Sequence, residues 1–435
     1  MAPSPLNRIV HRTVLDNGLV VLFVENPAAD IIACRMFIRA GTLKEPPGYS
    51  GLAHLLAAVL TKGTAEFSSL EIAERVESVG ASLGADAAAD YFLFSLKTVS
   101  ADFPDLLDLA AHLLRNPSFP EAEVELERRL TLRSIRSQQE QPFAIAFDRL
   151  RQAMYLNHPY SFSSLGTEAT LSQLTCEDLH SYHQTYFRPD NTVISLAGRL
   201  SPEEAVELVK KSFGDWENPP TLLPDIYLPF LTPAPQQILV SQETQQSIVI
   251  LGYLAPSVRR GEAMNANPSD YAALKLLNTY LGNGLSSRLF VELREKRGLA
   301  YDVSALYPTR LEASQFAVYM GTAPENTSIA ITGLRAEVDR LCNLKLSEEE
   351  LQRSKNKLLG QYALGKQTNA QLAQIFGWYE VLGLGIEFDT IFTEEISAIT
   401  PTIAMDAACR YLSEPYISIV GPASALSELE VPVVC

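Results

Sequence analysis

The sequence predicts an α+β protein made of two similar domains, each with a mostly antiparallel β-sheet packed against helices. Its 435 residues correspond to about two to three domains, at roughly 150 residues each. Hydrophobic residues make up 47% of the chain and charged residues 20%, so large cores can form. A proline-rich stretch near the middle, residues 216–237, indicates an extended linker. The segments before and after this linker have their expected helices and strands in the same order.

The first half begins with strands. Residues 18–25 and 31–40 are rich in β-branched and aromatic side chains and are separated by NPAAD, so we expect them to be adjacent strands. Two more strands are expected over 81–99. Because the opening pair of strands breaks strict β-α-β alternation, the pattern favours a mostly antiparallel sheet with helices on one face. The expected helices of this half lie at about 49–62, 68–79 and 104–155.

The two halves resemble each other in layout. A turn and a charged amphipathic helix at 116–138 correspond to residues 343–362. A helix, a turn and an apolar strand at 171–198 correspond to residues 396–422. Two copies of one fold explain this correspondence. The expected domains are therefore residues 1–215 and 238–435, joined by the linker 216–237.

Composition excludes several classes of function. The formal net charge of −16 argues against nucleic-acid binding and against an anionic membrane surface, because both require basic patches. Five scattered cysteines with no C-x-x-C predict a reducing compartment without a disulfide framework. No apolar run has the length of a membrane span, and the first residues have no secretory signal, so we expect a cytoplasmic protein.

One segment of the first half has a specific family pattern. GYSGLAHLLAAVLTKGT, followed by SSLEIAERVESVGASLGADAAADYFLF, resembles the pitrilysin-type zinc peptidases, which include mitochondrial processing peptidase and insulin-degrading enzyme. Their hallmark is the inverted zinc motif H-x-x-E-H. The phrase LGNGLSSRLFVELREKRGLAYDVSA (281–305) resembles the C-terminal domain of the same family. The resemblance extends over about residues 8–425 and implies a processing-peptidase-like fold.

Against the family's motif, the zinc site of this chain is degenerate. His54 occupies the first ligand position, but Ala57 replaces the glutamate base and Ala58 replaces the second histidine. The resemblance places the third ligand, a glutamate in the family, at Ser134. One imidazole and one hydroxyl cannot replace two imidazoles, a carboxylate and a base. We therefore expect no metal in this chain.

Other candidate ligands have ordinary explanations. A lone histidine on an apolar helix face, such as His54, is more often packed than ligating. His180 and His183 in HSYH have the i, i+3 spacing of a metal pair, but the surrounding sequence is typical of the family's helix-to-strand corner. Glu127 matches a carboxylate often seen behind the family's zinc site, although an ordinary solvated glutamate explains it better.

The second half keeps a pair that the resemblance assigns to substrate binding. Arg294 and Tyr301 have the seven-residue spacing at which catalytic family members supply an arginine and a tyrosine to the substrate. A guanidinium and a phenol can donate hydrogen bonds to the oxyanion of a tetrahedral intermediate. A structural turn with a charged helix before it is the alternative. Gly282 and Gly284 lack a phosphate-loop sequence and indicate a flexible loop near the substrate channel.

These observations favour a non-catalytic subunit of a heterodimeric zinc peptidase. Its expected partner is a paralogous subunit with an intact H-x-x-E-H, which would hold the zinc, and its expected ligands are peptides. The alternative is a scaffold or assembly protein that has the same fold but no proteolytic role. An intact Arg294–Tyr301 pair disfavours the scaffold, and a self-sufficient peptidase with displaced ligands is a weaker third hypothesis.

Overall fold

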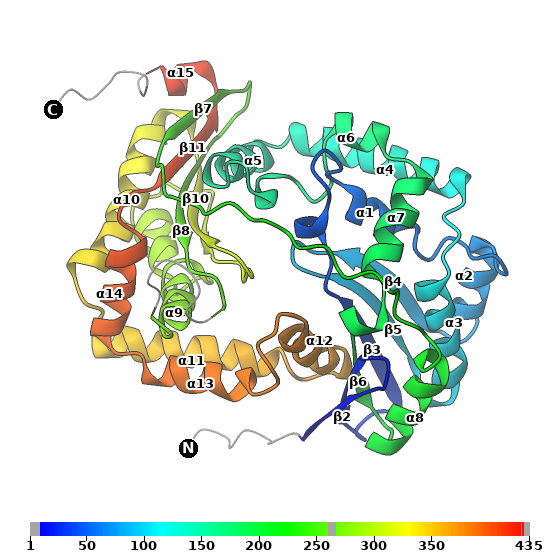
Figure 1. The fold of residues 1–435 in the computed structure, drawn as a ribbon. Helices are drawn as coiled ribbons and strands as arrows, with labels where there is room; N and C mark the ends of the chain where they lie inside the picture. Colours follow the sequence, from blue (N-terminus) through cyan, green and yellow to red (C-terminus); the bar gives the residue numbers. More distant parts are fainter. Residues whose placement is uncertain (1–8, 260–266, 428, 430–435) are drawn as a thin grey trace. The chain divides into compact units, whose positions relative to one another are not determined.

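The computed structural model describes residues 9–259, 267–427 and 429. These residues form two compact units, each with one β-sheet and its own helices (Figure 1). Unit 1 contains the described residues up to Ile135, together with 163–227 and 363–389. Unit 2 contains residues 136–162, 228–362 and the described residues from Thr390 onward.

The sheet of unit 1 has six strands in the order β1-β2-β6-β3-β5-β4. All neighbouring strands are antiparallel except β2 and β6, which are parallel. The prediction that residues 18–25 and 31–40 form adjacent strands is wrong, because β6 lies between them. β6 is buried along its whole length, so it takes the central place in the sheet. The strands are β1 Val10–Val14, β2 Val20–Glu25, β3 Ile31–Ile38, β4 Ser82–Ala87, β5 Phe92–Val99 and β6 Thr192–Gly198.

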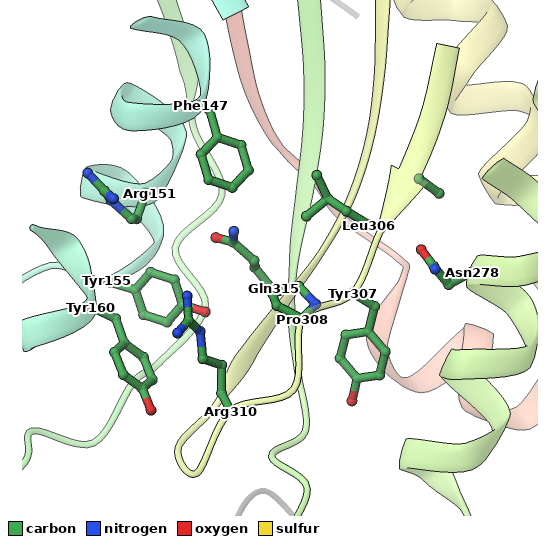
Figure 2. Close-up of a pocket in the computed structure, with 11 residues that line it drawn as sticks. Phe147, Arg151, Tyr155, Tyr160, Asn278, Leu306, Tyr307, Pro308, Arg310 and Gln315 are labelled. Carbon is green, nitrogen blue, oxygen red and sulfur yellow. The ribbon is translucent and has the colours of Figure 1, made fainter. Parts of the chain in front are cut away.

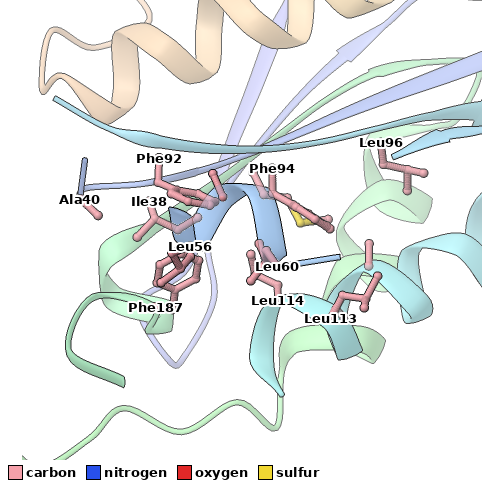
Figure 3. Packing of buried hydrophobic residues seen from close by; sticks show 14 of the residues in the cluster. Ile38, Ala40, Leu56, Leu60, Phe92, Phe94, Leu96, Leu113, Leu114 and Phe187 are labelled. Carbon is pink, nitrogen blue, oxygen red and sulfur yellow. The ribbon is translucent and has the colours of Figure 1, made fainter. Parts of the chain in front are cut away.

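Helices α1, α3 and α8 pack against strands of this sheet and enclose the core of unit 1. Figure 3 shows part of this core, with Phe92 and Phe94 of β5 beside Leu56 and Leu60. The apolar residues of α1 recur at helical spacing, so one face of the helix is buried. The helices are α1 Leu52–Val59, α2 Ser69–Glu77, α3 Phe103–Arg115, α4 Glu121–Gln139, α6 Glu168–Gln173, α7 Cys176–Tyr186 and α8 Pro202–Phe213.

The sheet of unit 2 has five strands in the order β7-β11-β8-β10-β9. Only β7 and β11 are parallel. The strands are β7 Gln237–Ser241, β8 Ser247–Ala255, β9 Asp302–Leu306, β10 Ser314–Thr322 and β11 Tyr416–Gly421. The helices that follow β8 in sequence, apart from α12, are α9 Asp270–Gly282, α10 Thr327–Asn343, α11 Glu348–Leu364, α13 Phe388–Ala398, α14 Pro401–Tyr411 and α15 Ala423–Leu426.

Each unit also holds one helix from the other half of the sequence. Helix α12 (Asn369–Val381) packs on β3 and β6 of unit 1. Successive side chains of a strand point to opposite faces of the sheet. Phe37 of β3 contacts α12 on one face, and its neighbour Met36 belongs to the core cluster that includes residues of α1 on the other face. The prediction of helices on only one face is therefore wrong for this sheet. Its two faces are covered by different parts of the chain.

The counterpart in unit 2 is α5 (Pro142–Met154), which packs on β8 and β11. At Gly252 of β8, an added Cβ would lie 2.8 Å from the sulfur of Met154, so the helix approaches the strand closely there. Ser418 of β11 donates a hydrogen bond to the carbonyl of Ala146, 2.8 Å away. Two segments thus cross the division that we expect at the linker.

The proline-rich segment has no helix or strand from Glu217 to Gln236, and several of its apolar side chains are exposed. Leu222 and Tyr227 are each 92% exposed, which is unusual for large apolar side chains. Four cysteines of the described chain, Cys34, Cys176, Cys342 and Cys409, are free thiols. In the described residues, no helix combines the length and the apolar character that crossing a bilayer requires.

Candidate functional site

Helix α1 carries the degenerate motif and begins beside the half-buried side chain of Glu45. Gly51 precedes the helix with φ +96°, and an added Cβ would lie 2.6 Å from the carbonyl oxygen of Leu165. Glu45 accepts hydrogen bonds from the backbone N–H groups of Gly51 and Ala53, at 3.3 and 2.8 Å. Burial raises the pKa of Glu45 to about 8, although these two hydrogen bonds oppose the shift. The Glu45 carboxyl group therefore caps an N-terminus that has no side-chain cap of its own.

His54 and Ala58 share the face of α1 that the core does not bury completely. Both are half-buried and lie four residues apart, whereas Ala57 is 6% exposed. Burial lowers the pKa of His54, while the negative charges of Asp86 and Glu127 oppose that shift. The imidazole is accordingly near two carboxylates, but the methyl groups of Ala57 and Ala58 offer no ligand or base.

Ser134 and Glu127 come from α4. Ser134 is exposed, and its hydroxyl donates to the carbonyl of Leu130 in the preceding turn, at 3.2 Å. Glu127 forms an ion pair with Lys62, whose Nζ lies 3.1 Å from its carboxylate. One of the two carboxylates near His54 is thus neutralised by an ammonium group of this chain. The sequence analysis did not predict that Lys62 belongs to this region. Its position only four residues after Ala58 could have indicated this.

The family's zinc does not fit the residues present here. Within the described ranges, no group of three or more His, Cys, Asp or Glu side chains is arranged to hold a metal ion. A zinc site requires about four ligands, and His54 is the one family ligand that this chain keeps. No catalytic step through a metal follows from this arrangement.

The HSYH histidines lie on α7 and are packed against aromatic rings. The His180 ring lies edge-on to Phe119, with centroids 4.9 Å apart. His183 is 6% exposed, and its Nε2 lies 2.8 Å from the carbonyl oxygen of Leu114. Burial lowers the pKa of His183 to about 4, so it is neutral at pH 7. These contacts give both histidines a structural explanation.

Arg294 and Tyr301 both lie in unit 2 and are both exposed. Arg294 belongs to the π-helical turn Phe290–Glu295, and its guanidinium lies over the Phe290 ring, 5.0 Å from the centroid. Gly298, at φ +63°, ends the turn by donating its N–H to the Arg294 carbonyl. Tyr301 is 61% exposed, and its backbone N–H bonds to Gly321 of β10.

The side chains of this pair are available to a ligand. In the described part of the chain, neither the Arg294 guanidinium nor the Tyr301 hydroxyl has a hydrogen-bond partner. Their backbones, in contrast, are fixed by the turn and by the sheet. Such an arrangement can present a guanidinium and a phenol to an external acceptor without breaking an internal contact.

The two glycines differ in role. Gly282 is the last residue of α9, and an added Cβ would lie 1.9 Å from the backbone nitrogen of Ala305. It therefore permits close packing of α9 on β9 and is not part of a loop, which corrects the prediction for this residue. Gly284 lies in the loop after α9 with φ +75°.

Comparisons with known proteins place this fold among the zinc peptidases of one family. Residues 20–168 match the insulinase domain of peptidase family M16, and residues 173–358 match the inactive domain of peptidase M16. An uncharacterized zinc protease of Streptomyces coelicolor is 28% identical over 423 residues, covering 95% of this chain and 90% of that protein. A Bacillus subtilis zinc protease, also uncharacterized, is 27% identical, covering 95% of this chain and 98% of that protein.

Solved structures agree in fold. A protease from Helicobacter pylori superimposes with a TM-score of 0.88 at 22% identity, covering 95% of this chain and all of that one. A peptidase M16 inactive domain from Pseudomonas fluorescens has a TM-score of 0.87 at 24% identity, covering 95% of this chain and 98% of that one. The fold is thus that of M16-type peptidases. The chain belongs to peptidase family M16, the pitrilysin family, and carries the degenerate motif of a non-catalytic member.

Proposed function

We propose that this chain is the non-catalytic subunit of a heterodimeric zinc peptidase. A paralogous partner with an intact H-x-x-E-H holds the zinc and the general base, and this chain contributes substrate-binding groups. One observation carries the proposal. The ligand positions are lost at Ala57, Ala58 and Ser134, while Arg294 and Tyr301 remain exposed with their side chains free of internal hydrogen bonds in the described structure.

The chemistry of the pair supports an oxyanion role. When the partner's nucleophile adds to a peptide carbonyl, negative charge develops on the carbonyl oxygen. The Arg294 guanidinium and the Tyr301 hydroxyl donate hydrogen bonds to that oxygen, and the positive charge of the arginine strengthens this interaction. Both groups stabilise the transition state more than the ground state, so they raise turnover.

The test is reconstitution with a paralogous chain that carries an intact motif and comes from the same genome. We expect the isolated chain to hydrolyse no peptide, and the mixture to hydrolyse a fluorogenic peptide in a chelator-sensitive reaction. Arg294→Ala and Tyr301→Phe should each lower kcat by about 10²–10³-fold, the cost of one oxyanion donor in other enzymes. Size-exclusion chromatography should show that both variants still assemble.

A matched control separates charge loss from loss of the oxyanion contact. Arg353 on α11 is also an exposed arginine, with a side chain 70% exposed, and Arg353→Ala should leave turnover unchanged. If the complex assembles but neither Arg294→Ala nor Tyr301→Phe alters turnover, the pair is structural. Assembly without any hydrolysis favours the scaffold function instead.

A further inference from the structure

Unit 2 contains a cavity of about 490 Å³ whose lining includes none of His54, Ala57, Ala58, Ser134, Arg294 and Tyr301. One wall comes from α5 and the turn after it, with Phe147, Arg151, Tyr155 and Tyr160 (Figure 2). The volume lies in the range of small-ligand sites, which is about 300–1,000 Å³. Since α5 comes from the first half of the sequence, the cavity exists only because that helix packs in unit 2.

Other lining residues come from β9, β10 and the connection between these strands. Tyr307 and Arg310 lie on the connection between β9 and β10, and Gln315 is the second residue of β10. Asn278 of α9 closes the far end (Figure 2). The cavity is thus lined by aromatic rings and a few polar groups, as is typical of sites that bind organic ligands.

The charged side chains that line the cavity are both arginines. Arg151 and Arg310 line it, and no carboxylate does among the described residues that form its walls. Arg310 lies over the Tyr160 ring, 5.0 Å from its centroid, and no ion pair to Arg310 occurs in the described chain. Arg151 pairs with Asp148, yet its Nε is buried without a hydrogen-bond partner there. Two guanidiniums near one another repel, so an anion between them is favourable.

The cavity also contains hydrogen-bond acceptors that lack donors. Gln315 is 4% exposed, and its Oε1 accepts no hydrogen bond from the described residues. The Oδ1 of Asn278 is likewise buried and without a donor in that part of the chain. A buried polar atom without a partner is costly, so a ligand that donates to it gains affinity. An anion without a hydrogen-bond donor satisfies the arginines but not these oxygens.

We propose that this cavity binds the carboxyl terminus of a peptide. The terminal carboxylate accepts hydrogen bonds from Arg151 and Arg310, and the last backbone N–H of the peptide donates to Gln315. The final side chain, apolar or aromatic, lies among Phe147, Tyr155 and Tyr160. The ligand class rests on the proposed function, in which this chain binds peptides for its partner.

The test measures binding to the isolated full-length chain, so it needs neither the partner nor hydrolysis. The probe is a tetrapeptide with an N-terminal fluorophore and a C-terminal phenylalanine, followed by fluorescence anisotropy. Its C-terminal amide is the matched ligand. We expect the amide to bind about ten- to hundredfold more weakly, because it loses charge-assisted hydrogen bonds. Arg310→Gln and Arg151→Gln should each weaken the free acid by a similar factor and affect the amide little.

Arg149→Gln is the control variant, because Arg149 is an exposed arginine on the same helix and does not line the cavity. It should bind the probe like the wild type. Arg310→Gln keeps the test decisive if Arg151→Gln fails to fold. Equal affinities of the acid and the amide overturn the proposal. Displacement of the probe by millimolar phosphate, with no effect of amidation, also overturns it and indicates a general anion site.

The two proposals can fail separately. If the reconstituted complex shows no hydrolysis but the isolated chain prefers the free acid, the heterodimer hypothesis fails and the cavity assignment stands. If Arg294→Ala lowers turnover but the acid and the amide bind equally, the heterodimer hypothesis stands and the cavity assignment fails.

Discussion

At the scale of single residues, Ala57 and Ala58 remove functional groups without altering the backbone that presented them. α1 is a regular helix, and His54 and Ala58 share one of its faces. The ion pair between Lys62 and Glu127 places a positive charge against a carboxylate close to that face. A charge paired in this way avoids the cost of an isolated carboxylate. Glu127 therefore has its counter-charge within this chain and does not depend on a metal ion for it.

Restoring the lost ligands tests this view of the backbone. We expect Ala57→Glu, Ala58→His and Ser134→Glu together to bind close to one equivalent of zinc, whereas the wild type binds well under one equivalent. The affinity should be weak, because the groups that orient the ligands have also diverged. The measurement is zinc content by metal analysis after dialysis.

The control for that variant adds His54→Ala to the three changes. It should lose the zinc while it keeps the circular dichroism spectrum of the triple variant. If the triple variant folds yet holds no more zinc than this control, then α1 and α4 do not present the three positions to one point, and the assignment of Ser134 is wrong.

A second residue-scale prediction concerns His183. Burial lowers its pKa to about 4 from 6.5, so the unfolded chain binds this proton more readily than the folded chain. Stability is therefore lost as the pH falls from about 6.5 towards 4. Between pH 7.5 and 5.5, which stays above the isoelectric point of 4.9, His183 should lower the free energy of unfolding by about 1 kcal/mol.

Urea unfolding at the two pH values measures this effect. His183→Gln should be less stable at pH 7.5, because the contact with Leu114 changes, but its stability should fall less on acidification. The exposed His11 supplies the control, and His11→Gln should keep the full pH dependence. An equal pH dependence in wild type and His183→Gln would exclude His183 as the source.

At the scale of elements, the chain order predicted most segments but not all of their neighbours. The strands at 18–25 and 31–40 exist as β2 and β3, because alternation and β-branched content are local signals. Their separation by β6 depends on a strand more than 150 residues away in sequence, which no local pattern reports. Likewise, the helical stretch expected over 104–155 includes α5, but no local pattern indicates that α5 covers the sheet of unit 2 or that α12 covers the sheet of unit 1. For the same reason, the sequence did not predict the cavity between α5 and β10.

The packing of α12 on the sheet gives a test at this scale. Gly377 lies inside α12, where an added Cβ would be 2.3 Å from the Phe37 ring and 2.8 Å from Ser195 Cβ. Both neighbours belong to buried strands and cannot move away easily. Gly377→Ala should therefore lower the free energy of unfolding by about 1–3 kcal/mol, despite the better helix propensity of alanine.

Gly360 is the matched control, since it lies inside the helix α11, is exposed, and has nothing within 4 Å of an added Cβ. Gly360→Ala should raise the free energy of unfolding by up to about 1 kcal/mol. Denaturant unfolding measures both variants. A stabilising Gly377→Ala would show that α12 does not approach β3 and β6 as closely as the structure indicates.

At the scale of the whole molecule, the sequence predicted the fold class because the two halves repeat one order of segments. The prolines of residues 216–237 also predicted a segment without regular structure, and no helix or strand occurs from Glu217 to Gln236. The sequence did not predict that each compact unit takes a segment from the other half. Unit 1 needs α12 to cover β3 and β6, and unit 2 needs α5 to cover β8 and β11. Neither half of the sequence therefore contains a complete unit.

This exchange predicts how the chain behaves when it is divided in the linker. Residues 1–227 expressed alone lack α12, so the side of β3 that carries Phe37 is exposed to water, and residues 228–435 lack α5 over β8. Exposure of such large apolar surfaces favours aggregation or partial unfolding. Co-expressed, the two fragments should associate in a 1:1 complex that unfolds in a cooperative transition, as judged by size-exclusion chromatography and thermal circular dichroism.

A second experiment cleaves the folded protein. The full chain with a protease site inserted after Leu223, in an exposed stretch without helix or strand, should stay assembled after cleavage. Cooperative unfolding of either fragment on its own would show that each half folds independently, and the exchange of α5 and α12 would then not be required for stability.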